Sequence, residues 1–207
     1  MKRLGPLLAL LGAWAVPAMA QWEFAGGPTV GWSMSQIHGD GVSGFNKLGL
    51  SAGFTLDVTP ESGRTVRSGL LFTQKGSRRV PNPKAGDYTT WRYRLTYLDV
   101  PLLRVVRRSS GVWFAGGVQA SYLLRGEEDF YGNGYEPLTY LNLRPVDLCA
   151  IGAVGYDAAG NSRLEVRLSQ SVVPIAPRPP NPVPRYDNFM MNLCIQVLGS
   201  WNFSASR

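Results

Sequence analysis

The chain has 207 residues, with 24 glycines, 11% aromatic residues, 17% charged residues and a formal net charge of +7. This length allows one substantial domain or two small ones, and glycine together with tyrosine and tryptophan is typical of a β protein with many turns. No stretch after residue 20 is long and apolar enough for a membrane helix, which excludes a protein held by helices. The mean hydropathy of −0.08 would suit a soluble protein, but transmembrane barrels give the same average because half of each strand is polar.

The first twenty residues have the pattern of a signal peptide. Lys2 and Arg3 give a positive start, an apolar run follows, and residues 18–20 form a small-x-small cleavage site. The run is short for a spanning helix, which argues against an uncleaved anchor. We therefore expect residues 1–20 to be removed on export and the mature domain to span residues 21–207.

Eight segments of the mature chain show the period-two alternation of β-strands. In the fifth segment, Val112, Phe114 and Val118 fall on one face, whereas Gln119 and Ser121 fall on the other. Several segments exceed the roughly nine to eleven residues that a tilted strand needs to cross a bilayer, while soluble strands run about five or six. The expected strands cover residues 22–34, 45–58, 66–76, 91–106, 112–125, 143–157, 162–172 and 188–203.

The connections between these segments alternate in length. Short turns are expected near residues 59–65, 107–110 and 158–161, and long loops near residues 35–44, 77–90, 126–142 and 173–187. Outer-membrane barrels combine short periplasmic turns with long external loops. The sequence therefore predicts an all-β, eight-stranded antiparallel up-and-down transmembrane barrel, integral to the bacterial outer membrane, with both termini in the periplasm.

Aromatic residues are expected to form two girdles on the lipid-facing surface. Those near the turns are Trp22, Phe24, Trp113, Tyr156, Trp201 and Phe203, and those near the loops are Trp32, Trp91, Tyr93, Tyr122 and Phe189. The alternation alone does not fix which face points outward. If the polar faces did, the chain would be a soluble exported barrel that binds a lipophilic ligand, as lipocalins do.

Three stretches resemble the PorT-type outer-membrane β-barrel family, which has a strand ending in QKG, a Y-L-E/D-I/V-P-L-L strand and a glycine-containing strand ending near Y-L-L. The matching stretches are Leu70-Leu71-Phe72-Thr73-Gln74-Lys75-Gly76, Tyr97-Leu98-Asp99-Val100-Pro101-Leu102-Leu103, and Gly116-Gly117 with Tyr122-Leu123-Leu124. The resemblance covers residues 66–125 well and the remaining mature chain loosely. It implies an eight-stranded outer-membrane barrel and, for some members, a role in protein secretion or surface assembly. The chain departs from many such barrels because it continues past Phe203.

Charged residues at inward-facing positions predict a polar network inside the barrel. The interior of an eight-stranded barrel is just wide enough for its own side chains, so we favour ion pairs and hydrogen bonds over a selective pore. These charges need partners, because unpaired buried ions are costly. The residues are Arg67, Lys75, Asp147, Arg163, Glu165 and Arg167.

A second basic set clusters around the second long loop. Guanidinium groups suit bidentate contacts with phosphate, so lipopolysaccharide binding at the outer rim and a solvated basic loop both remain open. The expected partners are outer-membrane lipid, lipopolysaccharide and an envelope protein that meets the loops; nothing indicates nucleic acid. The basic residues are Arg78, Arg79, Lys84, Arg92 and Arg94.

No motif predicts an enzyme, a metal site or a cofactor. A lipid-modifying hydrolase would need a nucleophile within reach of His38, the single histidine, and we favour a solvated side chain there. One histidine and two separated cysteines give no metal-ligand spacing, and no nucleotide fingerprint is present. Cys149 and Cys194 form a disulfide only if the fold brings their strands together. The sequence thus predicts a non-enzymatic barrel with a structural, anchoring or interaction role; the lipocalin-like barrel and the hydrolase are the alternatives.

Overall fold

The computed structural model describes residues 22–108, 110–158, 161–178 and 188–205, so the predicted signal peptide, residues 1–20, lies outside the described residues. One short 3-10 helix, η1 (Pro83–Ala85), and ten strands make up the regular structure of this part of the chain. Among the described residues, no helix has the length and hydropathy to span a membrane. The eight long strands are β1 (Glu23–His38), β2 (Lys47–Thr59), β3 (Val66–Arg79), β4 (Trp91–Arg107), β5 (Val112–Phe130), β7 (Val146–Asp157), β8 (Ser162–Ser171) and β9 (Met191–Trp201).

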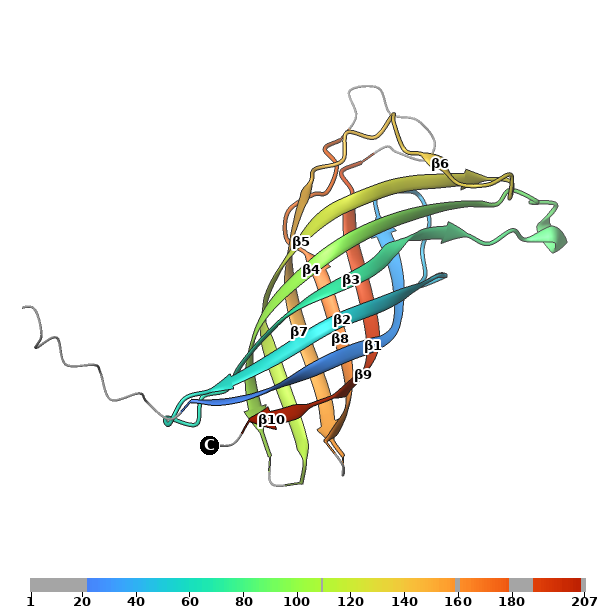
Figure 1. The fold of residues 1–207 in the computed structure, drawn as a ribbon. Helices are drawn as coiled ribbons and strands as arrows, with labels where there is room; N and C mark the ends of the chain where they lie inside the picture. The colour runs from blue at the N-terminus through green and yellow to red at the C-terminus, as the bar shows by residue number, and fades with distance from the viewer. Residues whose placement is uncertain (1–21, 109, 159–160, 179–187, 206–207) are drawn as a thin grey trace, which may run out of the picture.

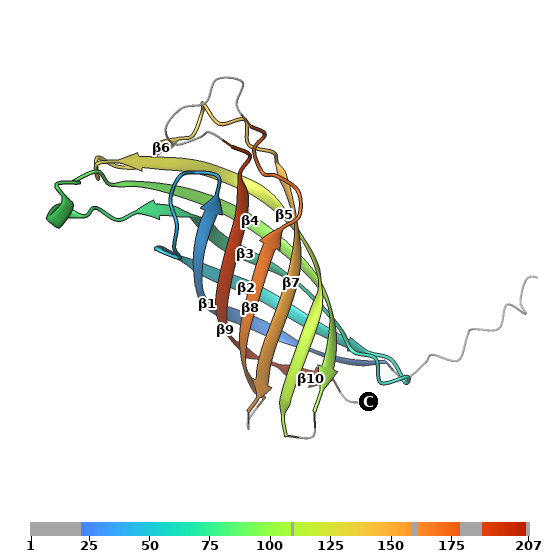
Figure 2. The ribbon, with the colours of Figure 1, turned by 180° about the vertical axis from the view of Figure 1, so that it is seen from behind.

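The long strands form one antiparallel sheet that closes on itself. Each strand pairs with the next along the chain, and β9 pairs back with β1, from Thr29 opposite Ser200 to His38 opposite Met191. Two short strands extend the sheet: β6 (Glu136–Pro137) pairs with β5, and β10 (Phe203–Ala205) pairs with β1. The closed barrel is seen from two sides in Figures 1 and 2. It confirms the predicted eight-stranded up-and-down barrel.

The two ends of the barrel differ in their connections. The β2–β3, β4–β5 and β7–β8 turns lie at one end, together with the start of β1 and with β10 (Figure 1). The longer connections lie at the opposite end. We refer to these as the turn end and the loop end.

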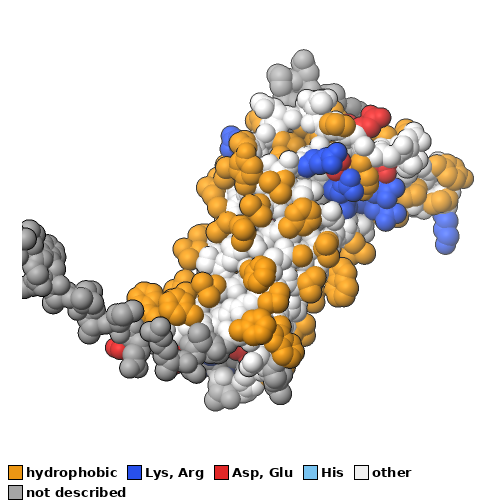
Figure 3. Space-filling view, viewed as in Figure 1, with side chains coloured by type: hydrophobic (Ala, Val, Ile, Leu, Met, Phe, Trp, Pro, Cys, Tyr) orange, Lys and Arg blue, Asp and Glu red, His pale blue; other side chains and the backbone are white. Residues whose placement is uncertain are grey.

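Apolar side chains cover the outside of the barrel wall, as Figure 3 shows for one face. Trp32 is 68% exposed, whereas the polar side chains of the alternate positions, such as Ser33, are buried in the lumen. A lipocalin-like barrel requires the opposite arrangement, so that alternative is wrong. Further outward-facing residues are Val30, Leu50, Phe54, Leu70, Leu102, Phe114, Val118, Tyr122, Leu164, Leu168 and Trp201.

Three aromatic residues do not belong to the outward girdles. Trp91 and Tyr93 are each 1% exposed, and Trp113 is fully buried, so their predicted lipid-facing position is wrong. Successive side chains of a strand point to opposite faces, and these three residues occupy inward-facing positions of β4 and β5. Val112 and Phe114, the neighbours of Trp113 in the sequence, lie on the other face of β5.

Strands β3, β4 and β5 continue past the barrel wall at the loop end (Figure 1). The β2–β3 pairing stops at Ser51 opposite Thr73, but the β4–β5 pairing runs on to Trp91 opposite Phe130. The first residues of the long loop predicted near 126–142 are therefore the end of β5, which runs to Phe130. A register shift between Thr96 and Tyr97, which is a β-bulge, lies where this extension begins. We call residues 74–96 and 125–138 the arm.

Candidate functional site

The predicted basic set lies on the arm. Arg78 and Arg79 end β3, Lys84 is in η1, and Arg92 and Arg94 begin β4. The β3–β4 register places Arg78 opposite Arg92 and Gly76 opposite Arg94, so the strand pairing brings the two runs together. Lys and Arg side chains accordingly gather on the arm in Figure 3.

Three of these five cations have acidic partners. Arg79 pairs with Asp87 at 2.7 Å. Arg92 pairs with Asp129 at 2.9 Å, and Arg94 pairs with Glu127 at 2.7 Å. The last two contacts join neighbouring strands, because β4 and β5 are in register here.

Two cations of the set remain available for a ligand. Arg78 and Lys84 are exposed, and neither has an ion-pair partner within the part of the chain that the structure describes. By contrast, the hydrogen bond from Arg79 lowers the pKa of Asp87 to about 2, so this pair stays ionised at any physiological pH. The structure therefore separates two free cations from three that are neutralised locally.

Most of the predicted lumen residues gather around Asp57 near the turn end. Arg67 donates two hydrogen bonds to its carboxylate, at 2.6 and 3.0 Å. Arg107 and Arg163 each donate one more, at 2.6 and 3.0 Å. Arg67 also reaches across the lumen to Glu165 at 2.9 Å. This arginine cluster joins β2, β3, β4 and β8 through one shared carboxylate.

The arginine cluster extends to Arg167 and Trp113. Arg167 donates from Nε to Glu165. The guanidinium of Arg67 lies 4.1 Å above the ring of Trp113, and that of Arg163 lies 5.6 Å from it. The face of an indole ring stabilises cations that are removed from water, which accounts for the inward-facing Trp113 at this end of the lumen.

The other two predicted lumen residues, Lys75 and Asp147, lie farther toward the loop end. Lys75 donates to Asp99 and to Ser121, each at 3.1 Å. Asp147 accepts a hydrogen bond from Asn192 at 2.9 Å. We call these five residues, with Tyr97 and Gln119, the lysine cluster.

An apolar cap fills the interior closest to the loop end. Inward-facing residues of β4 supply one side of it, and residues from the connections β5–β7 and β8–β9 cover the other. These side chains are buried against one another, so hydrocarbon fills this part of the interior. The buried members are Ile37, Trp91, Tyr93, Leu95, Tyr97, Leu141, Ile175, Ala176 and Met190.

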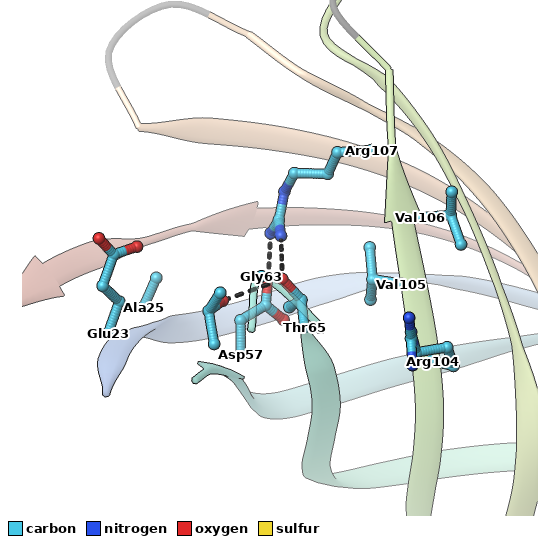
Figure 4. A pocket seen from close by; sticks show the side chains of 10 residues that line it. Glu23, Ala25, Asp57, Gly63, Thr65, Arg104, Val105, Val106 and Arg107 are labelled. Carbon is cyan, nitrogen blue, oxygen red and sulfur yellow. Dashed lines mark hydrogen bonds and ion pairs between the residues drawn. The ribbon is translucent and has the colours of Figure 1, made fainter. Parts of the chain in front are cut away.

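The turn end has an open hollow of about 510 Å³. Glu23, Thr65 and Arg104 are among the residues that line it, and Arg107 crosses it to Thr65 and Asp57 (Figure 4). Because Arg107 already binds Thr65, Asp57 and Asp157, its donors are engaged within the protein.

The remaining candidates of the sequence bring no catalytic arrangement together. The His38 ring lies 3.4 Å from the Gln36 amide nitrogen, on the exposed end of β1. Cys149 and Cys194 are both buried and free. Strand β8 separates them, since Ser171 pairs with Cys149 and Ser169 with Cys194. Within the described residues, no three His, Cys, Asp or Glu side chains group as metal ligands.

Several residues of the two lumen clusters were not predicted as site residues. Asp57, Asp99 and Asn192 each accept or donate hydrogen bonds that hold a predicted residue in place. The alternation puts them on the polar faces of their strands, but the pattern carries no information on which strands meet across the lumen. The alternation could therefore have identified these residues as inward-facing, but not as partners of the predicted lumen residues.

Comparisons with known proteins agree with this geometry. A family model described as outer membrane protein beta-barrel domain matches residues 15–176. No curated protein has a matching sequence.

Matching solved structures include two bacterial proteins. Ail, the attachment invasion locus protein of Yersinia pestis, solved in complex with the heparin analogue sucrose octasulfate, has a TM-score of 0.51 and 12% identity, over 87% of this chain and 99% of that one. Neisserial surface protein A has a TM-score of 0.48 and 10% identity, over 89% of this chain and 98% of that one. At this identity the likeness to Ail shows the fold alone.

Proposed function

We propose that this chain, which belongs to the outer membrane protein β-barrel domain family, binds anionic groups of lipopolysaccharide through the arm at its loop end. The protein is an integral outer-membrane barrel whose apolar outer wall meets lipid. The single observation that carries the binding role is the pair of free, exposed cations, Arg78 and Lys84, beside three cations that have acidic partners. A guanidinium and an ammonium suit phosphate contacts.

The likeness to Ail supports the choice of an anionic saccharide as ligand. That protein was solved with a sulfated sugar, sucrose octasulfate, and its chain is matched over 99% of its length. In the present chain, Arg92 and Arg94 would form the base of the site, since their acidic partners hold them in place. We also propose that an envelope protein binds the same loops.

The orientation follows from the same proposal. The loop end faces the exterior, both termini lie in the periplasm, residues 1–20 are removed as a signal peptide and residues 21–207 form the mature barrel domain. Support comes from the sorting of short and long connections to opposite ends. Amino-terminal sequencing of the membrane-inserted protein tests the removal of residues 1–20, and protease shaving of whole cells tests which end of the barrel faces the exterior.

We further propose that the lumen network is structural and that the barrel acts without catalysis. The arginine cluster, the lysine cluster and the apolar cap together fill the interior with side chains. The narrower PorT-type assignment, with its link to secretion or surface assembly, also stays a proposal; it is supported by Gln74-Lys75-Gly76 and the strand around Pro101.

The test of the binding role is a double variant, Arg78→Ala with Lys84→Ala, in purified barrel reconstituted in detergent. Because two unpaired cations are lost from the site, we expect lipopolysaccharide affinity to fall roughly tenfold. The matched control is Arg104→Ala with Arg108→Ala, which removes the same charge from exposed positions at the turn end. An equal loss in both double variants, or none in the first, would contradict the proposal.

A further inference from the structure

The lysine cluster consists of two hydrogen-bonded halves. Lys75 Nζ bonds Asp99 Oδ1 and Ser121 Oγ, and Ser121 Oγ also accepts from the Gln119 amide at 3.0 Å. On the far side, the Asn192 amide donates to Asp147 Oδ2 at 2.9 Å and to the Tyr97 hydroxyl at 3.3 Å. The Lys75 ammonium lies 4.8 Å above the Tyr97 ring, which joins the two halves.

Four side chains of this network each leave one oxygen without a partner. Within the described residues, Asp99 Oδ2, Gln119 Oε1, Asp147 Oδ1 and Asn192 Oδ1 accept no N–H or O–H hydrogen bond, and the Cys149 thiol is the group beside the Asp147 carboxylate. All four residues are at most 2% exposed, so bulk water does not reach these atoms. Buried acceptors without donors are costly and uncommon.

The strand register gathers these oxygens into one part of the lumen. Asp99 pairs with Ser121, and Ser121 pairs with Asp147, so the two carboxylates flank one serine on three adjacent strands. Gln119 and Asn192 bond directly to members of that row. Lys75 bonds Asp99 and lies over the Tyr97 ring, and the Asn192 amide joins the Tyr97 hydroxyl to Asp147, so the ammonium and the two acids belong to a single cluster.

The charges of this cluster do not balance. It contains two carboxylates and one ammonium, and the arginines of the turn end are remote. Arg67 is opposite Leu103, four residues or about 13 Å along β4 from Asp99. Arg167 is opposite Ala153, six residues or about 20 Å along β7 from Asp147. Among the described residues, Lys75 is ion-paired with Asp99 and no arginine is ion-paired with either carboxylate, so Asp147 has no ion-pair partner.

We propose that the lysine cluster binds a monovalent alkali cation, such as Na⁺, between the free oxygens of Asp99, Asp147, Gln119 and Asn192. Carboxylate and amide oxygens are the ligands that hard cations prefer. Water would satisfy the four acceptors but would leave the buried charge uncompensated, whereas one monovalent cation satisfies both. With two acids and two neutral amides, the four unpartnered oxygens form a set of hard ligands that fits an alkali ion.

The test compares unfolding of the full barrel in two salts. The protein is refolded into detergent in about 100 mM NaCl or about 100 mM choline chloride, which have equal ionic strength, and the temperature of the folded-to-unfolded gel shift is measured. Because the cation binds only the folded barrel, we expect a midpoint several degrees higher in NaCl. Equal midpoints in the two salts would overturn the proposal and leave water or a retained proton to satisfy the oxygens.

Variants show whether any Na⁺ effect arises at this site. Asp147→Asn removes the excess charge, so it is expected to unfold at the same temperature in both salts and above wild type in choline chloride. Asp157→Asn, at the turn end and ion-paired with Arg163, is the matched control and is expected to keep the NaCl advantage. A NaCl advantage that survives Asp147→Asn would place the cation elsewhere and overturn the assignment.

Discussion

The two ends of the barrel interior are filled in opposite ways. Near the turn end, Asp57 accepts hydrogen bonds from three arginines, and Glu165 pairs with Arg67 and Arg167. Near the loop end, the cap of Trp91, Leu95 and Met190 is almost wholly apolar. Strand β4 contributes to both regions, with Arg107 at the turn end and Trp91 and Leu95 in the cap.

The difference reflects what each region packs against. The arginine cluster lies within the closed barrel wall, where inward-facing side chains meet across the lumen and each arginine has a carboxylate partner. The cap is covered by chain connections whose backbone is paired locally, for example Ile175 N–H with Met190 C=O. Apolar contact suits this junction, because it stabilises loops without fixing each bond direction.

The most damaging change is expected in the arginine cluster. Asp57→Ala leaves two buried guanidinium groups, of Arg67 and Arg163, and the exposed one of Arg107 without their shared acceptor, so the free energy of unfolding should fall by about 3–5 kcal/mol. Urea titration of the barrel in lipid vesicles measures it. Asp157→Ala, whose side chain is 34% exposed, is the control and should cost clearly less. Equal costs would mean that the cluster does not depend on one carboxylate.

A truncation in the cap should cost less and act more locally. Leu95→Ala opens a cavity between β4 and the covering loops, with an expected loss of about 2–4 kcal/mol that depends on how far the neighbouring side chains close the space. The same urea titration, with limited proteolysis of the β5–β7 connection, follows it. Leu102→Ala on the outward face of β4 serves as control, since it leaves no internal cavity. Faster proteolysis in the control than in Leu95→Ala would contradict the assignment of the cap.

The smallest of the three effects is expected at Asp40, in the β1–β2 loop beside the cap. Burial raises the pKa of its carboxyl to about 6, against the hydrogen bond from the Val42 backbone. Since the folded-state pKa lies above the ordinary 3.8, the stability contributed by Asp40 is complete below that pH and is lost as pH rises through about 6.

Asp40→Asn should remove this pH dependence and raise stability at neutral pH by about 1–3 kcal/mol. Urea midpoints measured in steps from about pH 4 to pH 8 compare the two proteins. Asp87→Asn is the control, because Asp87 has the opposite shift, to about 2, and titrates below this range. A wild-type midpoint that stays constant between pH 4 and pH 7 would show that Asp40 is solvated.

Part of the site could be derived from strand alternation. The six predicted lumen residues, Arg67 to Arg167, all face the interior, because parity follows directly from position along a strand. The girdle predicted from aromatic character is wrong at Trp91, Tyr93 and Trp113, because their positions along the strands point inward. The sequence groups Arg92 and Arg94 with Arg78 and Lys84 in one basic set, because it does not show that β5 continues to Phe130 and brings acids beside them.

The sequence by itself determined the number of long strands, their order, the residues that share each strand face and the sorting of short and long connections, because these depend on spacing along the chain. Only the tertiary structure decided which charges meet. Closure of β9 on β1 sets the lumen, and the register across it gives Asp57 three arginines while leaving Asp99 and Asp147 to share one lysine. Contacts between distant strands depend on register and curvature, and neither is encoded by the alternation of a single strand.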